Sequence, residues 1–325
     1  MLKLRTATLV LLGCAAFCVS ARAQTGTETE TSPPAQVTAP QSLPAETNEA
    51  SADKPLPDVV AMMHDVEINQ RKAEAVEKDY LYHSVQTEQE IDGHGQVRKT
   101  TVTEFDHFWV NGVPVRRRVK KNGKALSPEE IAKEDERIDK ESAKARERRE
   151  KEDAQGKQTN SRGDEEITVS RLLELGAFTN PRRVQLNGRD TIAVDYAGDP
   201  RAKTRNRSED LIRDLAGTAW IDERDHVLAR VDGHFLNAFK IGGGLIVNIQ
   251  KDTRFSMVQI KVNDEVWLPA RLDAHGAIRA LLFVSFNGSG QIVNSDYRKF
   301  RATATVLPGV TQVEPAQSPD GAAHQ

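Results

Sequence analysis

The amino-acid sequence predicts an α+β fold, in which helices flank an antiparallel sheet. The main observation is a tract from Thr218 to Phe300 that is rich in β-branched and aromatic residues and is broken by short groups of turn-forming residues. Further hairpins are predicted over 80–121, and helical periodicity precedes them over 58–78. Long antiparallel strands need a partner for their apolar face, which is either a second layer or a ligand.

The first residues predict export from the cytoplasm. A short basic segment, MLKLR, precedes the apolar run TATLVLLGCAAFCVS, and Ala21-Arg22-Ala23 matches an A-x-A cleavage signal. We expect a signal peptide over 1–23 and a mature chain that begins at Gln24, periplasmic or secreted, without a transmembrane helix. The alternative is a lipid anchor at Cys14, because Leu11-Leu12-Gly13-Cys14 resembles a lipobox.

Composition excludes several classes of chemistry from the mature chain. Both cysteines, Cys14 and Cys18, lie in the predicted signal, so disulfides, thiolate catalysis and Cys-ligated zinc are excluded after cleavage. The signal also holds Lys3, Arg5 and Arg22 and no acidic residue, so its removal takes the formal charge from -3 to -6. This mild acidity argues against a nucleic-acid partner.

The order of the remaining segments follows from shifts in composition. Residues 24–57 are rich in Thr, Glu, Pro, Ala and Ser and almost free of large apolar residues, so we expect a disordered linker. Residues 311–325 form a similar tail. The predicted folded domain spans 58–310.

The domain is expected to begin with a helix and three strands. The helix spans 58–78 with Asp58 as its N-cap, and strands follow over 80–91, 97–110 and 113–121. The turns between the strands are Asp92-Gly93 and Asn111-Gly112, both strong hairpin signals. The apolar residues that recur at helical spacing are Val59, Met62, Met63, Val66, Ala73 and Val76.

A highly charged helix is expected next, as an insertion over 127–163. Ser127-Pro128-Glu129-Glu130 is a capping box with proline at the first helical position. The helix continues to about Asp153, and Ile131 and Ile138 are its only large apolar residues. Such a helix buries little, so we expect it to project from the domain, supported by pairs such as Glu136–Lys140 and Glu147–Lys151.

The C-terminal half is expected to be a series of hairpins with two short helices. One helix spans 165–175 and ends at Gly176, and the other is capped by Ser208 and stops at Gly217. A hairpin over 184–196 lies between them. The chain is predicted to reverse at Arg224-Asp225, Asn263-Asp264, His275-Gly276 and Gly288-Ser289-Gly290.

Three short motifs resemble a known group of exported proteins. They are Trp220-Ile221-Asp222, Trp267-Leu268-Pro269 and the closing segment SDYRKF, which begins at Ser295. In this order they are similar to the half-barrel of periplasmic lipoprotein carriers, the LolA, LolB and RseB group. The resemblance covers 57–310 loosely and 218–301 best, and it implies a half-barrel sheet with a leading helix and short lid helices. The chain lacks the Arg-Pro-containing strand of the carriers, and its charged helix is extra.

The apolar strand residues form the first candidate site. In a half-barrel they lie on the concave face, where they are core if helices cover them and an acyl-chain site if they stay uncovered. Val258, Ile260 and Val262 alternate, as do Leu281, Phe283 and Ser285. The tentative ligand-binding residues are Met63, Trp220, Phe255, Met257, Trp267 and Phe283.

The basic hairpin forms the second candidate site. Arg116, Arg117 and Arg118 either protect an edge strand by their charge or contact anionic headgroups or an acidic partner. Gly242-Gly243-Gly244 is interpreted as a mobile connection, with a hinge at the mouth of a cavity as the alternative.

No motif indicates catalysis, a metal or a cofactor. The chain has no HExxH, GxSxG or P-loop, the single SxxK match from Ser51 to Lys54 lies in the predicted linker, and Ser84, beside His83, has no expected partner to orient a base. We therefore expect a non-enzymatic envelope protein that binds an apolar ligand, such as a lipid or a lipoprotein acyl chain. The alternative is an interaction or envelope-sensing module that binds another envelope protein through the charged helix and the basic hairpin.

Overall fold

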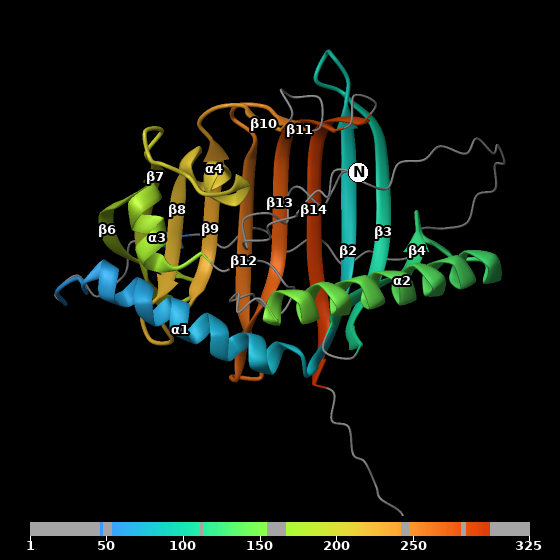
Figure 1. The fold of residues 1–325 in the computed structure, drawn as a ribbon, viewed down its shortest axis with the longest axis horizontal. Coiled ribbons are helices and arrows are strands. Elements are labelled where there is room, and N and C mark those ends of the chain that lie inside the picture. The colour runs from blue at the N-terminus through green and yellow to red at the C-terminus, as the bar shows by residue number, and fades with distance from the viewer. Residues whose placement is uncertain are drawn as a thin grey trace, which may run out of the picture.

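The protein is described as a computed structural model, which covers residues 46–47, 54–110, 113–154, 167–241, 247–280 and 284–299. These residues form helices α1 to α4 and one 14-stranded sheet whose strand pairs are antiparallel. The main path of the sheet runs β1-β6-β7-β8-β9-β12-β13-β14-β2-β3-β4-β5, with β10 and β11 beside it. The sheet is open, with α1 and α2 in front of it (Figure 1), so the predicted α+β half-barrel class is confirmed.

The strands of the N-terminal half have the predicted bounds. They are β2 (Tyr80–Ile91), β3 (Val97–Val110) and β4 (Val113–Lys121), and the short β5 (Lys124–Ala125) follows them at the edge. The opposite edge is β1 (Glu46–Thr47), which pairs with β6 (Gly176–Leu186). Two residues of the predicted disordered linker therefore belong to the sheet. The predicted signal peptide and the C-terminal tail lie outside the described residues.

The first helix covers one face of the sheet. Helix α1 (Val59–Glu77) starts at the predicted cap, because the Asp58 carboxylate accepts from the backbone N–H groups of Val60 and Ala61. Its apolar stripe packs with residues of β7 (Arg189–Gly198) and β8 (Leu215–Asp222) into one cluster. The buried members of the cluster are Met62, Met63, Val66, Val169, Ile192, Val194, Ala219 and Ile221. The side of β7 and β8 that carries these residues is the helix-covered face.

The two short helices differ in part from the prediction. Helix α3 (Val169–Leu175) ends at Gly176, as expected, but it begins after its cap Thr168 and not at the predicted residue 165. Helix α4 (Arg207–Arg213) is capped by Asn206, whose side chain accepts from Glu209 N at 3.0 Å, so the predicted cap at Ser208 is wrong. The predicted stop at Gly217 is also wrong, because this residue lies inside β8, where a Cβ would come within 2.0 Å of the Asp232 carbonyl oxygen.

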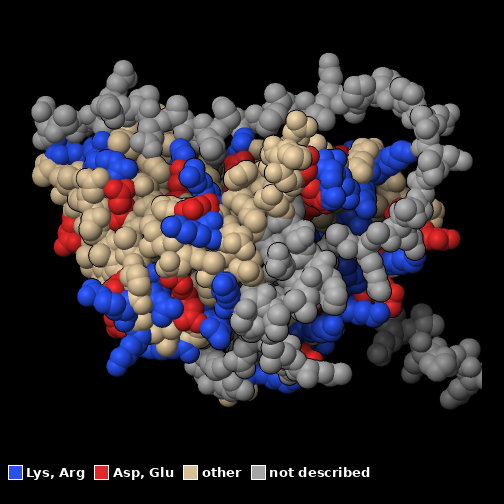
Figure 2. All heavy atoms as spheres, turned by 90° about the horizontal axis from the view of Figure 1, so that it is seen from above, with Lys and Arg blue, Asp and Glu red and all other residues tan. Residues whose placement is uncertain are grey.

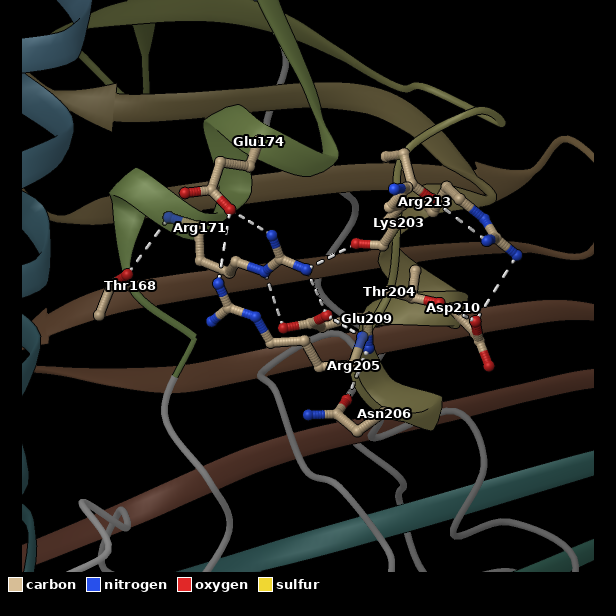
Figure 3. Close-up of polar contacts among 11 residues, drawn as sticks. Thr168, Arg171, Glu174, Lys203, Thr204, Arg205, Asn206, Glu209, Asp210 and Arg213 are labelled. Carbon is tan, nitrogen blue, oxygen red and sulfur yellow. Dashed lines mark hydrogen bonds and ion pairs between the residues drawn. The ribbon is translucent and has the colours of Figure 1, made fainter.

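The two short helices are joined by an ion pair that Figure 3 shows in detail. Arg171 of α3 donates from Nε and Nη2 to the two carboxylate oxygens of Glu209 of α4, at 2.8 and 2.6 Å. The same guanidinium donates to the Lys203 carbonyl at 2.8 Å, and the Arg205 N–H donates to Glu209 at 2.5 Å. Two side chains thus hold α3, α4 and the loop between β7 and α4 as one unit.

The C-terminal strands are longer than the sequence predicts. They are β9 (Leu228–Phe235), β10 (Phe239–Ile241), β11 (Val247–Ile249), β12 (Arg254–Val262), β13 (Val266–Ala280) and β14 (Val284–Lys299). The predicted reversals at Arg224-Asp225 and Asn263-Asp264 are confirmed. Those at His275-Gly276 and Gly288-Ser289-Gly290 are wrong, since β13 and β14 run straight through them and Gly276 pairs with Gly288.

The charged helix α2 (Pro128–Asp153) packs on β4. The expectation that it projects from the domain is therefore wrong where the helix contacts this strand. The predicted capping box forms, with Ser127 and Glu130 bonded reciprocally. Ile138 is 7 % exposed and Glu134 is 4 % exposed. Burial alone would raise the pKa of Glu134, but hydrogen bonds from Arg137 and from Arg118 N outweigh it and lower the pKa. One apolar and one ionised residue therefore anchor the helix.

The two isoleucines of α2 provide a test of this packing. Ile138→Ala should lower the free energy of unfolding by about 2 kcal/mol, because it leaves a cavity against β4. Ile131 is 42 % exposed, so Ile131→Ala should change it by less than about 0.5 kcal/mol. Urea unfolding of the two variants measures the difference. Equal, small effects would mean that α2 does not pack on the sheet in solution.

Candidate functional site

The opposite face of the sheet, away from Ile192, Val194, Ala219 and Ile221, is hollowed. The hollow has a volume of about 1190 Å³ and lies over six adjacent strands from β8 to β2, with two residues of β7 at its end. We call it the polar hollow. Its lining is mixed, because the side chains of Trp220 and Ala216 lie beside many hydrogen-bonding groups.

Strand register places these hydrogen-bonding groups in straight rows. Side chains alternate between the two faces along each strand, so residues paired in register across antiparallel strands share a face. One row crosses seven strands without interruption, and we call it the central row. It consists of Asp195, Thr218, Asp232, Ser256, Asp273, Gln291 and Thr87.

A short repeat in the sequence builds the middle of the hollow. Residues 229–234 read ARVDGH on β9, and residues 270–275 read ARLDAH on β13. Both strands pair with β12, and the repeats are in register across it. Three rows result: Arg230, Val258 and Arg271; Asp232, Ser256 and Asp273; His234, Arg254 and His275. The arginine, aspartate and histidine of each repeat share one face because they are spaced two residues apart.

The aspartates of the repeats are paired with the arginines of their own strands. Arg230 bonds Asp232 through Nε at 3.0 Å and Nη2 at 2.5 Å, and Ser256 donates to Asp232 Oδ1 at 2.6 Å. On the other side, Arg271 bonds Asp273 at 2.6 and 2.9 Å, and Gln291 donates to the same carboxylate at 3.0 Å. The negative charges of the central row are thus balanced within the sheet in this region.

The negative charge of Asp195, at the β7 end of the central row, is balanced in the same way. The Asp195 carboxylate accepts from Arg182 at 3.0 Å, Thr218 at 2.8 Å and Asn180 at 2.9 Å. Burial would raise the pKa of Asp195, but these hydrogen bonds outweigh burial and lower the pKa, so this carboxylate is ionised at neutral pH.

The third row of the repeat region is basic and has a different character. His234 is half-buried, whereas Arg254 and His275 are exposed, and all three line the polar hollow. Within the described residues, no ion pair or hydrogen bond engages these three side chains, unlike the arginines of the neighbouring row. The row continues through Ser289 and Gln89, whose side chains bond each other at 3.2 Å.

The structure does not bring the six predicted ligand-binding residues onto one surface. Trp220 lines the polar hollow and packs in one cluster with Trp267, whose indole N–H donates to Asp225 at 2.9 Å. Met63 belongs to α1 and is buried in the core of the helix-covered face. Phe255 is buried and is among the residues that line the hollow. Met257 is buried and alternates with the residues that face the hollow, and Phe283 lies outside the described residues.

The predicted basic hairpin is largely occupied by internal contacts. Arg117 pairs with Asp135 of α2, and Arg118 lies 3.8 Å from Glu134. Arg116 lies over the Phe105 ring, with its guanidinium carbon 4.9 Å from the ring centre. Figure 2 also shows basic and acidic groups beside one another in the coloured part of the surface it views. The charges of Arg117 and Arg118 therefore help to hold α2. Gly242-Gly243-Gly244 lies outside the described residues.

Two serines, Ser84 and Ser256, were considered as nucleophiles from their surroundings in the structure. Ser84 does have a partner, which the sequence did not predict: its hydroxyl lies 2.8 Å from His107 Nε2. Ser84 is 1 % exposed, so its hydroxyl is not open to a substrate. Ser256 in the hollow donates its proton to Asp232, not to an imidazole. Among the described residues, no group of three or more His, Cys, Asp or Glu is arranged to hold a metal ion.

The polar hollow could have been found in the sequence through its repeat. The two ARxDxH hexapeptides are separated by 35 residues, and each has the two-residue spacing that places its polar groups on one face. What the sequence does not show is that both strands flank β12.

No helix among the described residues is long and apolar enough to cross a membrane.

Comparison with known proteins gives distant structural neighbours only. No family model matches the chain, and no curated protein matches it in sequence. A putative outer membrane lipoprotein-sorting protein domain from Vibrio parahaemolyticus is 10% identical, with 74% of this chain and 92% of that chain covered and a TM-score of 0.33. A DUF1329 family protein from Desulfovibrio piger is 9% identical, with 75% and 94% covered and a TM-score of 0.29.

A third neighbour is a LolA superfamily protein from Nitrosomonas europaea, at 10% identity, with 73% of this chain and 93% of that chain covered and a TM-score of 0.24. Two of the three therefore carry names from the group that the sequence resembles. Similarity at this level carries no argument about what the present chain binds, so its function has to be argued from its own residues.

Proposed function

We propose that this protein is a non-enzymatic binding protein of the cell envelope, and that the polar hollow binds an amphiphilic ligand such as a lipid or an acylated peptide. The observation that carries the proposal is a hollow of about 1190 Å³ with a mixed lining. Ligand sites of proteins are concave, have volumes of several hundred Å³ and combine apolar surface with a few well-placed polar groups. This hollow has the volume and the lining that such a site needs.

An amphiphile suits the hollow better than a bare acyl chain does. The central row presents hydrogen-bonding groups on seven neighbouring strands, and an apolar chain would cover them without offering them partners. The alternative place for an acyl chain is the helix-covered face. There, Met62, Met63 and Val66 of α1 pack directly on the sheet and fill the space in the described region.

The contacts of the polar groups support binding rather than catalysis. The carboxylates of the repeats are each held by an arginine in a fixed geometry, and Ser256 is bonded to one of them. A serine nucleophile needs a base that accepts its proton, and an aspartate whose oxygens are already bonded to arginine is poorly placed to act as one. Export, with the signal peptide removed after Ala23, remains part of the proposal and rests on the sequence.

The test compares two alanines that face each other across neighbouring strands. Ala216 lines the hollow, and its partner Ala197 on β7 is exposed outside the lining. Ala216→Trp should weaken the binding of a fluorescent lysophospholipid at least about tenfold, because the indole occupies the hollow. Ala197→Trp should leave the affinity unchanged within about twofold.

Fluorescence titration gives the affinities, and circular dichroism confirms that both variants fold. The proposal fails if the folded wild-type protein does not bind the probe, or if both variants bind it equally well. Lipid extraction of the purified protein followed by mass spectrometry then identifies the natural ligand.

A further inference from the structure

We propose that His234, Arg254 and His275 form an anion subsite in the polar hollow, which holds a phosphate group of the ligand. This proposal rests on the proposed function, since it assigns the polar end of the ligand to one row of residues in the same hollow. The three residues occupy equivalent positions on the adjacent strands β9, β12 and β13.

Strand register places three cationic or donor groups side by side. Arg254 is paired in register with His234 on one side and with His275 on the other. Neighbouring strands lie about 4.8 Å apart, so the two imidazoles flank the guanidinium at a distance that one oxyanion spans. All three residues line the hollow, so a ligand in the hollow can reach them.

The charges around the subsite favour an anion. Asp232 and Asp273, in the next row, are each bound by an arginine of their own strand, so they do not neutralise Arg254. The lining contains two more carboxylates. Asp195, on β7, is bound by Arg182, and Asp252, at the turn before β12, forms no ion pair with Arg254 in the described structure. Arg254 thus keeps its charge available, and the two imidazoles add donors.

The chemistry of the donors matches a phosphate group. A guanidinium presents parallel N–H groups to two oxygens of an oxyanion, and flanking imidazoles reach the other oxygens from both sides. A carboxylate has only two oxygens, and these are already satisfied by the guanidinium alone. The tetrahedral group therefore uses the whole set, and Ser289 and Gln89 extend the row with further hydrogen-bonding groups.

The experiment uses lysolipid probes that share one acyl chain but differ in the headgroup. We expect a probe with a phosphate headgroup to bind the wild-type protein at least about tenfold more tightly than an uncharged monoacylglycerol, as charge-assisted hydrogen bonds predict. Arg254→Gln should remove this preference, and Arg254→Lys should restore it in part. The matched control is Arg298→Gln, which changes an exposed arginine on β14 outside the lining and should leave the preference intact.

Each outcome decides the proposal. If both probes bind the wild-type protein equally, or if Arg254→Gln keeps the preference, the anion subsite is refuted while the amphiphile site stands. If a fatty acid binds as tightly as the phosphate probe, the phosphate assignment is refuted. If glycerol phosphate without an acyl chain binds as tightly as the lipid and loses affinity in Arg254→Gln, the subsite stands and the amphiphilic ligand is refuted. Should Arg254→Gln fail to fold, the double change His234→Gln, His275→Gln is measured in its place.

Discussion

Replacing Arg171 by leucine should lower the free energy of unfolding by about 3–5 kcal/mol, the usual effect of breaking a buried ion pair. The Arg171 side chain is 12 % exposed and that of Glu209 is 4 % exposed, so the change leaves a carboxylate with almost no access to water. The hydrogen bond to the Lys203 carbonyl is lost as well. Urea unfolding monitored by circular dichroism measures the effect, and a constant slope shows that the unfolded state is unchanged.

Two control variants distinguish the effect of leaving Glu209 unpaired from the effect of removing an arginine side chain. Arg205 lies in the same cluster, but its side chain is 70 % exposed and 3.7 Å from Glu174, so Arg205→Gln should cost less than about 1 kcal/mol. The double change Arg171→Leu, Glu209→Leu should recover much of the stability, because no unpaired charge remains. Similar losses for Arg171→Leu and Arg205→Gln would contradict the ion pair of Figure 3.

The pH dependence of the same variant provides an internal check. Hydrogen bonds from Arg171 hold the pKa of Glu209 below its usual range, burial opposes them, and the Arg205 backbone N–H adds to the lowering. The contribution of the pair is therefore fully present above the unfolded pKa, about 4.3 for glutamate, and is lost as the pH falls through the folded pKa. The difference between the wild-type protein and Arg171→Leu should shrink as the pH falls through that range.

Gly288→Ala should also destabilise the protein, by about 3 kcal/mol, although alanine adds a single methyl group. A Cβ at this position would come within 1.8 Å of the Gln89 carbonyl oxygen on β2, so two strands of the sheet would have to separate. Gly93 is the matched control, because a Cβ there meets nothing within 4 Å, and Gly93→Ala should change the stability by less than about 1 kcal/mol.

Thermal unfolding of the two glycine variants separates two interpretations of the segment around Gly288. If Gly288 formed a solvent-exposed reversal, as its sequence Gly288-Ser289-Gly290 suggests, both variants would unfold near the wild-type temperature. If it lies in the middle of β14, Gly288→Ala unfolds at a clearly lower temperature than Gly93→Ala. A negligible effect at Gly288 would show that the strand is broken there.

Three glycines that the sequence predicts at chain ends or reversals share one structural feature. The sequence predicts an end or a reversal at Gly217, Gly276 and Gly288, but each lies inside a strand. At each one, a Cβ would collide with a neighbouring strand or with Thr253. Glycine therefore has two uses, in turns and where backbones approach closely, and a single sequence does not distinguish them.

The bounds of local elements were predicted best where the signals are local. Helix α1 with its Asp58 cap, the capping box of α2, and the strands β2, β3 and β4 all follow from side chains within a few positions of one another. The packing of α2 on β4 was missed because it depends on Ile138 and Glu134 meeting a strand that lies elsewhere in the sequence.

The sequence by itself determined the α+β class, the antiparallel strands, the leading helix and the expectation of export, because period, caps and turn residues act over short distances along the chain. Only the tertiary structure decided which face is filled and which is hollow. The pairing of β9 and β13 with β12 converts two separate hexapeptides into three rows of facing side chains. Strand pairing joins residues that lie far apart in the chain, and for this reason the sequence does not show that Met63 and Met257 lie on a different face from the candidate site.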